Sequence, residues 1–349
     1  MTERWLEPLG LVTGPAAFHA VRSGAGLPLL GGPAAFLLVR RIAAGQDQGV
    51  GPVAGLGSEW DTALDRLTRP LPPFAGLGRT EGVPLVMGIV NTTPDSFSGD
   101  GLGRNAAAAI AHGHALLAAG ADMLDVGGES TRPGALPVTP EEEQRRILPV
   151  VRELAKATTV SVDTRNASTM AAVLEAGAEV VNDISALRHD GNALRVVQQA
   201  QAPLVLMHML GMDPRSMQQN PHYADVALDV ARFLRDRVET LERLGIPRGR
   251  IAVDPGIGFG KTVAHNLALL ERLPLLAGLG CTILVGVSRK GFIGRLTDTP
   301  EPGQRVAGSV AAALAATLRG AGILRVHDVA ETVQALKVWA ACEAGALPE

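Results

Sequence analysis

The stretch Leu85-Val-Met-Gly-Ile-Val-Asn91 sets the pattern of this chain, because it is an apolar run without polar alternation that ends in a polar residue. Such a run predicts a strand that is buried on both faces, as in a parallel sheet. The pattern returns seven more times, and loops and helical segments separate the runs. The later runs are Met123–Val126, Val160–Val162, Val180–Val181, Leu204–Met207, Ile251–Val253, Ile283–Val287 and Ile323–Val326.

The segments between these runs predict helices. Thr139-Pro-Glu-Glu142 is a strong helix start, because Thr caps the helix, Pro suits the first helical position and Glu suits the third. The other predicted helices are 105–119, 167–176, 194–199, 221–244, 263–276, 304–319 and 329–338. Eight buried strands that alternate with helices favour an α/β protein built as a (β/α)8 TIM barrel, although periodicity alone also permits an open doubly wound sheet.

Polar residues gather where the predicted strands end. In a (β/α)8 barrel these ends and the loops after them build the active site. An Asp or Asn after a strand can also simply cap the next helix, but an ordered set at so many strands favours one shared site. Arg132 and Lys290 from loops, together with Arg325, would add positive charge. The strand-end set is Asn91, Asp163, Asn182, His208, Asp254, Ser288 and His327.

Residues 1–82 do not follow this repeat, so we expect an N-terminal extension of unknown role, followed by a catalytic barrel at residues 83–345. The extension holds two Gly/Pro-rich apolar stretches, a short helix at Glu59–Leu67 and an extended linker at Arg69–Pro73. We expect it to pack against the barrel or to form a small appendage.

Composition excludes several classes of partner. A net charge of -3 and an aromatic content of 3% leave neither a basic footprint nor a stacking platform for nucleic acid. Gly26–Val39 is broken by Gly and Pro and is shorter than the run of about 18 apolar residues that a spanning helix needs. The two cysteines, Cys281 and Cys342, have no metal-binding spacing. We therefore expect a cytoplasmic protein without nucleic-acid or membrane partners.

One glycine-rich loop, Gly256-Ile-Gly-Phe-Gly-Lys-Thr262, ends like a phosphate-binding loop. The P-loop pattern fails because Pro255 stands where it needs glycine, and the dinucleotide pattern fails because Lys261 occupies its third glycine position. We expect these glycines to let the backbone approach a flat ligand beside Asp254. Lys261 is predicted to be a solvated loop charge.

Two long motifs stand out, Met87-Gly-Ile-Val-Asn-Thr-Thr-Pro-Asp-Ser-Phe-Ser98 and Gly120-Ala-Asp-Met-Leu-Asp-Val-Gly-Gly-Glu-Ser-Thr-Arg-Pro-Gly134. Shorter ones follow at Ser161–Thr164, Val181–Ser185, Asp254–Lys261, Ser288–Lys290 and Arg325–His327. With these motifs in this order, residues 84–343 resemble the dihydropteroate synthase family. The resemblance implies a (β/α)8 barrel that condenses 6-hydroxymethyl-7,8-dihydropterin pyrophosphate with 4-aminobenzoate. The products are 7,8-dihydropteroate, used in folate biosynthesis, and pyrophosphate.

The resemblance also implies a pterin site. A pterin presents a ring N–H beside an exocyclic amino group, and one carboxylate, that of Asp254, would accept from both. Lys290 would donate to the ring oxygen or the adjacent ring nitrogen, and Met207 would stack on the flat face. The implied pterin-binding set is Asp163, Asn182, Met207, Asp254, Lys290 and Arg325.

For pyrophosphate the resemblance implies binding by Asn91 and by the cations Arg132, Arg325 and His327. Mg²⁺ is the implied cofactor, with Asn91 as its protein ligand. This hard ion prefers oxygen ligands, and one amide oxygen would hold it weakly, so metal binding should depend on the pyrophosphate. We expect a dissociative substitution that works by positioning and electrostatics, without a protein nucleophile. The implied catalytic set is Asp163, Lys290, Arg325, His327 and Arg132.

The 4-aminobenzoate site is implied to lie between two loops and the cavity wall, and sulfonamides that mimic this substrate should inhibit. Gly291 departs from the family pattern, because many members carry Ser there. The implied binding residues are Phe97, Thr131, Arg132, Pro133, Phe259, Lys290 and Gly291.

Two alternatives share the barrel. A pterin-binding methyltransferase domain would not need the Ser130–Gly134 loop or the Arg325 and His327 anion site. A non-catalytic pterin-binding paralogue would be expected to lose Asp163, Arg132, Lys290 or Arg325, and all four are present. We expect an enzyme with small-molecule substrates. Since the family is usually dimeric, we also expect a homodimer.

Overall fold

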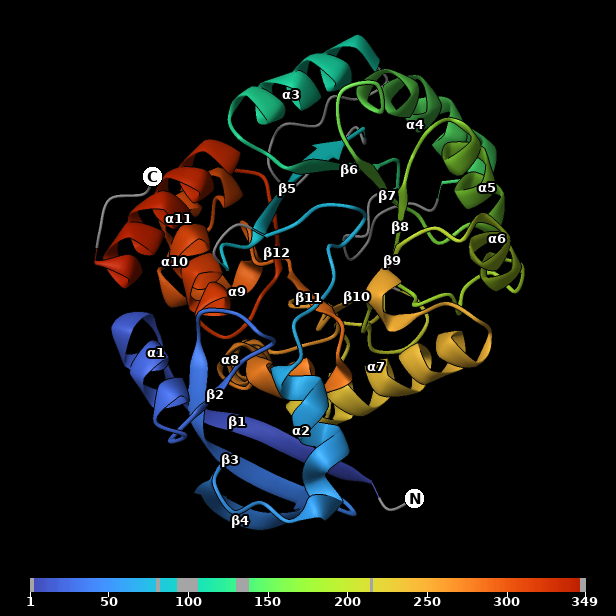
Figure 1. Cartoon of the computed structure of the whole chain (residues 1–349). Helices are drawn as coiled ribbons and strands as arrows, with labels where there is room; N and C mark the ends of the chain where they lie inside the picture. The colour runs from blue at the N-terminus through green and yellow to red at the C-terminus, as the bar shows by residue number, and fades with distance from the viewer. Residues whose placement is uncertain (1–2, 80–81, 93–105, 130–137, 214–215, 346–349) are drawn as a thin grey trace.

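Eight parallel strands close into a barrel, in the order β10-β11-β12-β5-β6-β7-β8-β9 (Figure 1). The computed structural model describes residues 3–79, 82–92, 106–129, 138–213 and 216–345. The strands are β5 (Leu85–Asn91), β6 (Met123–Gly127), β7 (Val160–Asp163), β8 (Val180–Asp183), β9 (Leu204–Met207), β10 (Ile251–Asp254), β11 (Thr282–Val285) and β12 (Ile323–Val326). The predicted (β/α)8 barrel is therefore confirmed, and the open sheet is excluded.

Helices surround the barrel close to where the sequence predicts them. They are α3 (Ala106–Ala118), α4 (Pro140–Leu154), α5 (Ala167–Glu175), α6 (Ala193–Ala200), α7 (Val226–Arg243), α8 (Val263–Glu271), α9 (Gly291–Leu296), α10 (Val306–Thr317) and α11 (Val329–Ala344). The predicted cap of α4 is confirmed, because the Thr139 hydroxyl accepts a hydrogen bond from the Glu142 backbone N–H at 3.3 Å.

Three helical segments differ from the prediction. Helix α7 begins at Val226 and not at Pro221, because the carboxylate of Asp225 caps it there. The predicted helix 263–276 divides into α8 and the 3-10 helix η3 (Leu273–Leu279), where Pro274 has no N–H to continue the α-helix. Helix α9 is too short to have been predicted. Two further 3-10 turns are η2 (Arg248–Arg250) and η4 (Pro302–Gln304).

The amino-terminal end of the barrel is closed by an apolar plug. Phe74, which is 2% exposed, packs there against inward-facing side chains of the barrel strands. The strand residues around it are Leu85, Met87, Met123, Val180, Val205, Ala252, Leu284 and Ile323. This plug leaves the carboxyl end of the strands as the end that can hold a ligand.

The N-terminal extension forms a four-stranded antiparallel sheet in which β3 pairs with β1, β2 and β4. Its elements are β1 (Arg4–Val12), α1 (Gly14–Arg22), β2 (Leu27–Pro28), β3 (Ala35–Ala43), β4 (Gln46–Pro52), η1 (Ser58–Trp60) and α2 (Asp61–Thr68). The short helix was predicted, but the strands were not. The sheet packs on the barrel through η3, and α1 lies beside α11 (Figure 1).

A buried ion-pair cluster joins the extension to the barrel. Glu7 of β1 is 1% exposed and accepts hydrogen bonds from Arg272 at 2.6 and 2.9 Å. Arg40 donates to the same carboxylate at 3.1 Å, and Arg272 also binds Asp225 at 2.7 Å. One guanidinium therefore connects β1 with the cap of α7.

Among the described helices, none is both long and apolar enough to cross a membrane.

Replacing Arg272 by Leu should destabilise the protein strongly, because the substitution removes the main partner of a buried carboxylate. Loss of one member of a buried pair costs on the order of 3 kcal/mol, and urea denaturation measures it. The matched control is Arg69→Leu, whose partner Asp65 is 54% exposed, so the expected cost is below about 1 kcal/mol. Equal effects of the two substitutions would contradict the role given to Arg272.

Candidate active site

A cavity of about 530 Å³ lies at the carboxyl end of the barrel strands. The predicted site residues Phe97, Thr131, Arg132 and Pro133 lie outside the described residues. The other residues predicted to bind substrates or metal all line this one cavity, whereas His208 of the strand-end set does not. They come from six strands, from the loops after β10, β11 and β12, and from the start of α9. They are Asn91, Asp163, Asn182, Met207, Asp254, Phe259, Lys290, Gly291, Arg325 and His327.

Arg325 of β12 stands at the centre of the charged side of this cavity. Its Nε donates to Asp125 Oδ2 at 2.6 Å, and its Nη2 donates to Asp163 Oδ2 at 3.1 Å. Asn182 Nδ2 donates to the same Asp125 oxygen at 3.2 Å. Side chains from β6, β7, β8 and β12 are thereby tied into one network, and a guanidinium that can also face a ligand is held in place.

Asp125 is a site residue that sequence reasoning missed. It is fully buried within β6, and it lies inside the long motif Gly120–Gly134. Asp125 stands between Leu124 and Val126, and so it is not part of the strand-end pattern. The available signal was a carboxylate in the middle of an otherwise apolar buried strand, which a protein keeps only with a partner.

Burial and mutual proximity shift the pKa values of this network. Burial lowers the pKa of Arg325, but the carboxylates of Asp125 and Asp163 outweigh this effect and leave the pKa above its usual value. Burial raises the pKa of Asp163 to about 7, although Arg325 opposes the change. Burial, reinforced by Arg325, lowers the pKa of Lys290 to about 8. The site therefore holds an acid and a base that titrate near neutral pH.

Another part of the cavity wall is apolar. Ile184, Met207, Met209 and Met217 form a buried cluster against which Phe259 packs. Lys290 bridges the two sides, because its Nζ lies 4.4 Å from the centre of the Phe259 ring. Asp254 accepts a hydrogen bond from the Gly256 N–H at 2.6 Å, and burial raises its pKa. An apolar wall together with a charged edge suits a flat ligand with a polar rim.

The glycines after β10 divide between loop packing and the cavity wall. Gly256 and Gly260 both have φ near +67°, and a side chain on either would collide with the loop after β9. They let these two loops pack closely. Only Gly258 of the three glycines lines the cavity, beside Lys290.

The prediction that Lys261 is a solvated charge was wrong. Lys261 is 4% exposed, and its Nζ lies 2.9 Å from His208 Nδ1 and 3.0 Å from the Phe259 carbonyl oxygen. Burial, with Lys261 nearby, lowers the pKa of His208 to about 2, so the imidazole is neutral and accepts from the lysine. The contact holds the loop after β10 against the loop after β9.

His327 lines the cavity, and its surroundings favour the neutral imidazole over the predicted cation. Burial, with the positive charge of Arg289 next, lowers its pKa well below the usual value. Its Nδ1 lies 3.0 Å from Ser288 Oγ. If the Ser288 hydroxyl donates to Nδ1, the neutral ring keeps an N–H at Nε2 as a hydrogen-bond donor. Arg289, which pairs with Asp328 at 2.5 Å, is a cavity cation that the sequence reasoning did not single out.

The fold and this site define a pterin-binding barrel enzyme, since a family model described as "Pterin binding enzyme" matches residues 87–327. A dihydropteroate synthase of Neisseria meningitidis serogroup C is 49% identical over 74% of this chain and 92% of its own length. With this match, the chain belongs to the dihydropteroate synthase family, and this family, not the methyltransferases, is confirmed.

Solved structures of dihydropteroate synthases agree with this family assignment. The Xanthomonas albilineans dihydropteroate synthase with 4-aminobenzoic acid superposes with a TM-score of 0.70 at 52% identity, over 75% of this chain and 93% of that one. The Yersinia pestis enzyme in a sulfonamide drug complex gives a TM-score of 0.74 at 43% identity, over 79% and 99%. The family model begins at residue 87, so the N-terminal sheet lies outside it.

The pKa of Asp163 predicts how pterin binding depends on pH. Because the pKa lies near 7, the carboxyl is mostly protonated at pH 6 and mostly ionised at pH 8. The ionised form holds Arg325 and accepts from ring N–H groups. The affinity for 6-hydroxymethyl-7,8-dihydropterin, which lacks a phosphate, should therefore rise about tenfold between these pH values by titration calorimetry. The Asp163→Asn variant should lose this rise, and identical profiles would contradict the assignment.

Proposed function

We propose that this cavity is where the chain, as a dihydropteroate synthase family member, joins 6-hydroxymethyl-7,8-dihydropterin pyrophosphate to 4-aminobenzoate. The observation that carries the proposal is the network of Arg325 with Asp125, Asp163 and Asn182, which shares one cavity with an apolar wall. Such a site offers charge to the rim of a flat heterocycle and apolar contact to its face.

The pterin is held by its edges. Asp254 accepts from the ring N–H and the neighbouring amino group in two parallel charge-assisted hydrogen bonds. Asn182 and Asp163 meet the other ring edges, and Lys290 donates to the ring oxygen or the nitrogen beside it. Met207 covers one face of the ring as part of the apolar wall.

The pyrophosphate is bound by Arg325, by the neutral His327 through its ring N–H, and by Arg132 from its loop. Asn91 fits a Mg²⁺ ligand, because it lines the cavity at the end of β5. Within the described ranges no group of three or more His, Cys, Asp or Glu residues could hold a metal ion. One amide oxygen suits a Mg²⁺ ion that keeps its waters and phosphate ligands, and the bound ion supplies neutralising charge to the leaving group.

The reaction then needs no protein nucleophile. The bond between the pterin methylene carbon and the pyrophosphate oxygen breaks, and the electron-rich ring stabilises the cationic carbon. The arylamine nitrogen bonds to that carbon and gives up a proton. Arg325 and Lys290 contribute charges that are already in position, and the apolar wall excludes water from the cation.

The second substrate binds next to the pterin. Phe259, Lys290 and Gly291 are adjacent on the cavity wall, and the loop residues Phe97, Thr131, Arg132 and Pro133 complete the proposed 4-aminobenzoate site. The relatives that bind 4-aminobenzoic acid and a sulfonamide support this assignment and the expectation that sulfonamides compete with the arylamine. The homodimer and the cytoplasmic location stay predictions.

The activity itself is tested by pyrophosphate release from the pterin pyrophosphate with Mg²⁺. Release should require 4-aminobenzoate, and Asp254→Asn should lower kcat/KM by at least about 100-fold, since a charge that orients the pterin is lost. The control is Asp236→Asn, at a side chain that is 71% exposed, which should behave as the parent protein. Release without the arylamine, or an unaffected Asp254→Asn variant, would contradict the proposal.

The role of Asn91 is tested by the dependence of turnover on Mg²⁺. Asn91→Ala should raise the Mg²⁺ concentration for half-maximal rate at least about tenfold, because the amide oxygen is lost. Asn91→Asp keeps an oxygen ligand, adds charge and should lower that concentration. Calorimetry of pyrophosphate binding with and without Mg²⁺ provides a readout that does not depend on turnover. An unchanged Mg²⁺ dependence in both variants would remove Asn91 from the metal site.

A further inference from the structure

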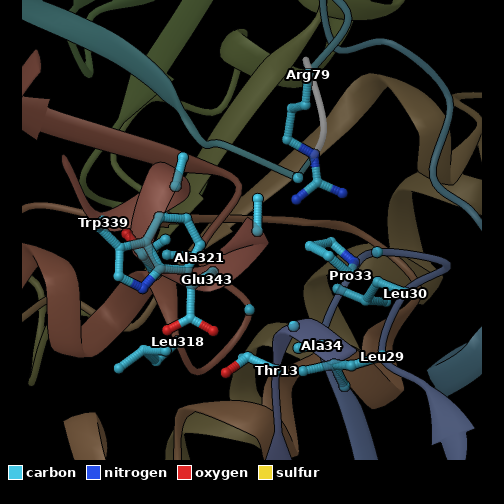
Figure 2. A pocket seen from close by; sticks show the side chains of 17 residues that line it. Thr13, Leu29, Leu30, Pro33, Ala34, Arg79, Leu318, Ala321, Trp339 and Glu343 are labelled. Atoms are coloured by element: carbon cyan, nitrogen blue, oxygen red, sulfur yellow. The ribbon is translucent and has the colours of Figure 1, made fainter. Parts of the chain in front are cut away.

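A second cavity lies between the N-terminal extension and the carboxyl-terminal helices, with a volume of about 200 Å³ (Figure 2). Its apolar wall comes from Leu29, Leu30 and Pro33 of the extension and from Leu318, Ala321 and Trp339 of the barrel. It shares no lining residue with the synthase cavity. Gly320 and Ala321 directly precede β12, so this cavity belongs to the end of the barrel opposite the active site.

The rim of the cavity is closely packed. A side chain at Gly14 would overlap the backbone oxygen of Glu343, and one at Gly82 would overlap the ring of Pro33. Both glycines also have positive φ values, +57° and +77°, which other residues rarely adopt. The extension is therefore fitted against the end of α11, and the space between them is preformed.

Two opposite charges line this apolar space, and neither has a partner among the residues that the structure describes. Arg79 and Glu343 form no ion pair with any described residue, nor with each other. In Figure 2 the guanidinium of Arg79 and the carboxylate of Glu343 lie apart, with the indole of Trp339 beside Glu343. Burial lowers the pKa of Arg79, which is the effect expected of a cation that has lost water without gaining a partner.

The wall also holds an unsatisfied donor. Trp339 Nε1 is buried and has no hydrogen-bond partner within the described part of the chain. Native proteins rarely leave a buried donor unpaired, so the packing around this indole is unusual. The cavity itself combines an apolar wall with a cation and an anion.

We propose that this cavity binds a small zwitterion with a single ring that carries both a carboxylate and an amino group. The carboxylate pairs with Arg79, the ammonium group pairs with Glu343, and the ring fills the space beside Trp339. The volume fits this size class, since a cavity of about 150 Å³ accommodates benzene. A molecule with one charge alone would leave either Arg79 or Glu343 unpaired in a partly buried site.

The test is calorimetric titration of the full chain with two zwitterions of different charge spacing, L-phenylalanine and 4-(aminomethyl)benzoate. Phenylacetate and benzylamine serve as probes that carry a single charge. At least one zwitterion should bind with a Kd below about 1 mM and raise the melting temperature. The corresponding single-charge probes should bind at least about tenfold more weakly.

Substitutions test whether the zwitterion binds in this cavity. Arg79→Gln and Glu343→Gln should each weaken it about tenfold, whereas Arg69→Gln, at an exposed arginine outside the cavity, should not. Ala340→Phe on α11 fills the space and should abolish binding. Lys290→Met, in the synthase site, should leave binding unchanged. Pyrophosphate release and the melting temperature without ligand show that the cavity variants fold.

Binding of neither zwitterion would overturn the proposal. So would binding that persists in both Arg79→Gln and Glu343→Gln, or that is lost in Lys290→Met alone, which would place the ligand in the synthase site. Because the synthase activity is measured separately by pyrophosphate release, failure of this proposal leaves the assignment of the active site unaffected.

Discussion

The half-buried guanidinium of Arg325 is the constraint on which the site depends. Its charge has lost most of its contact with water and needs close partners, which Asp125 and Asp163 provide. Those partners come from β6 and β7, and Asn182 on β8 joins them. The network forms only when β6, β7, β8 and β12 keep their positions relative to one another. The barrel therefore positions the site, and the network in turn ties these strands together. A ligand that enters the cavity meets charges already fixed in position.

The two ends of the barrel differ, and this difference decides at which end a ligand can reach the network. Phe74 and the surrounding apolar side chains close the amino-terminal end, while polar side chains from the carboxyl ends of β5, β7, β8, β10 and β12 line the cavity. The apolar wall of Met207 and its neighbours lines the same cavity as the charged edge. The loops after β9 and β10 are held together by Lys261 and His208 and by close packing at Gly256 and Gly260. A flat heterocycle therefore enters between a preformed edge and a preformed face.

The barrel could be predicted from the sequence because strands buried on both faces leave a local signal, and the site residues at the strand ends follow from that. Asp125 could not be predicted in this way, because it lies inside a strand and not at its end. The burial of Lys261 and the neutral state of His327 depend on neighbours distant in sequence, which no local pattern records. The four strands of the extension were missed for a related reason, since β4 (Gln46–Pro52) is polar and exposed and is defined only by its pairing with β3. The cavity between the extension and α11 arises from packing alone.

The most direct measurement is the rate of pyrophosphate release by the Asp125→Asn variant, with its folding verified by urea denaturation. Asparagine fits the same space and keeps an acceptor oxygen but cannot neutralise Arg325, so the guanidinium loses the negative charge of its partner at 2.6 Å. We expect a folded protein whose kcat/KM falls by at least about 100-fold, in line with the loss of a preorganised charge. A folded variant that turns over at the parent rate would show that the network around Arg325 is structural and that the reaction is organised by other groups.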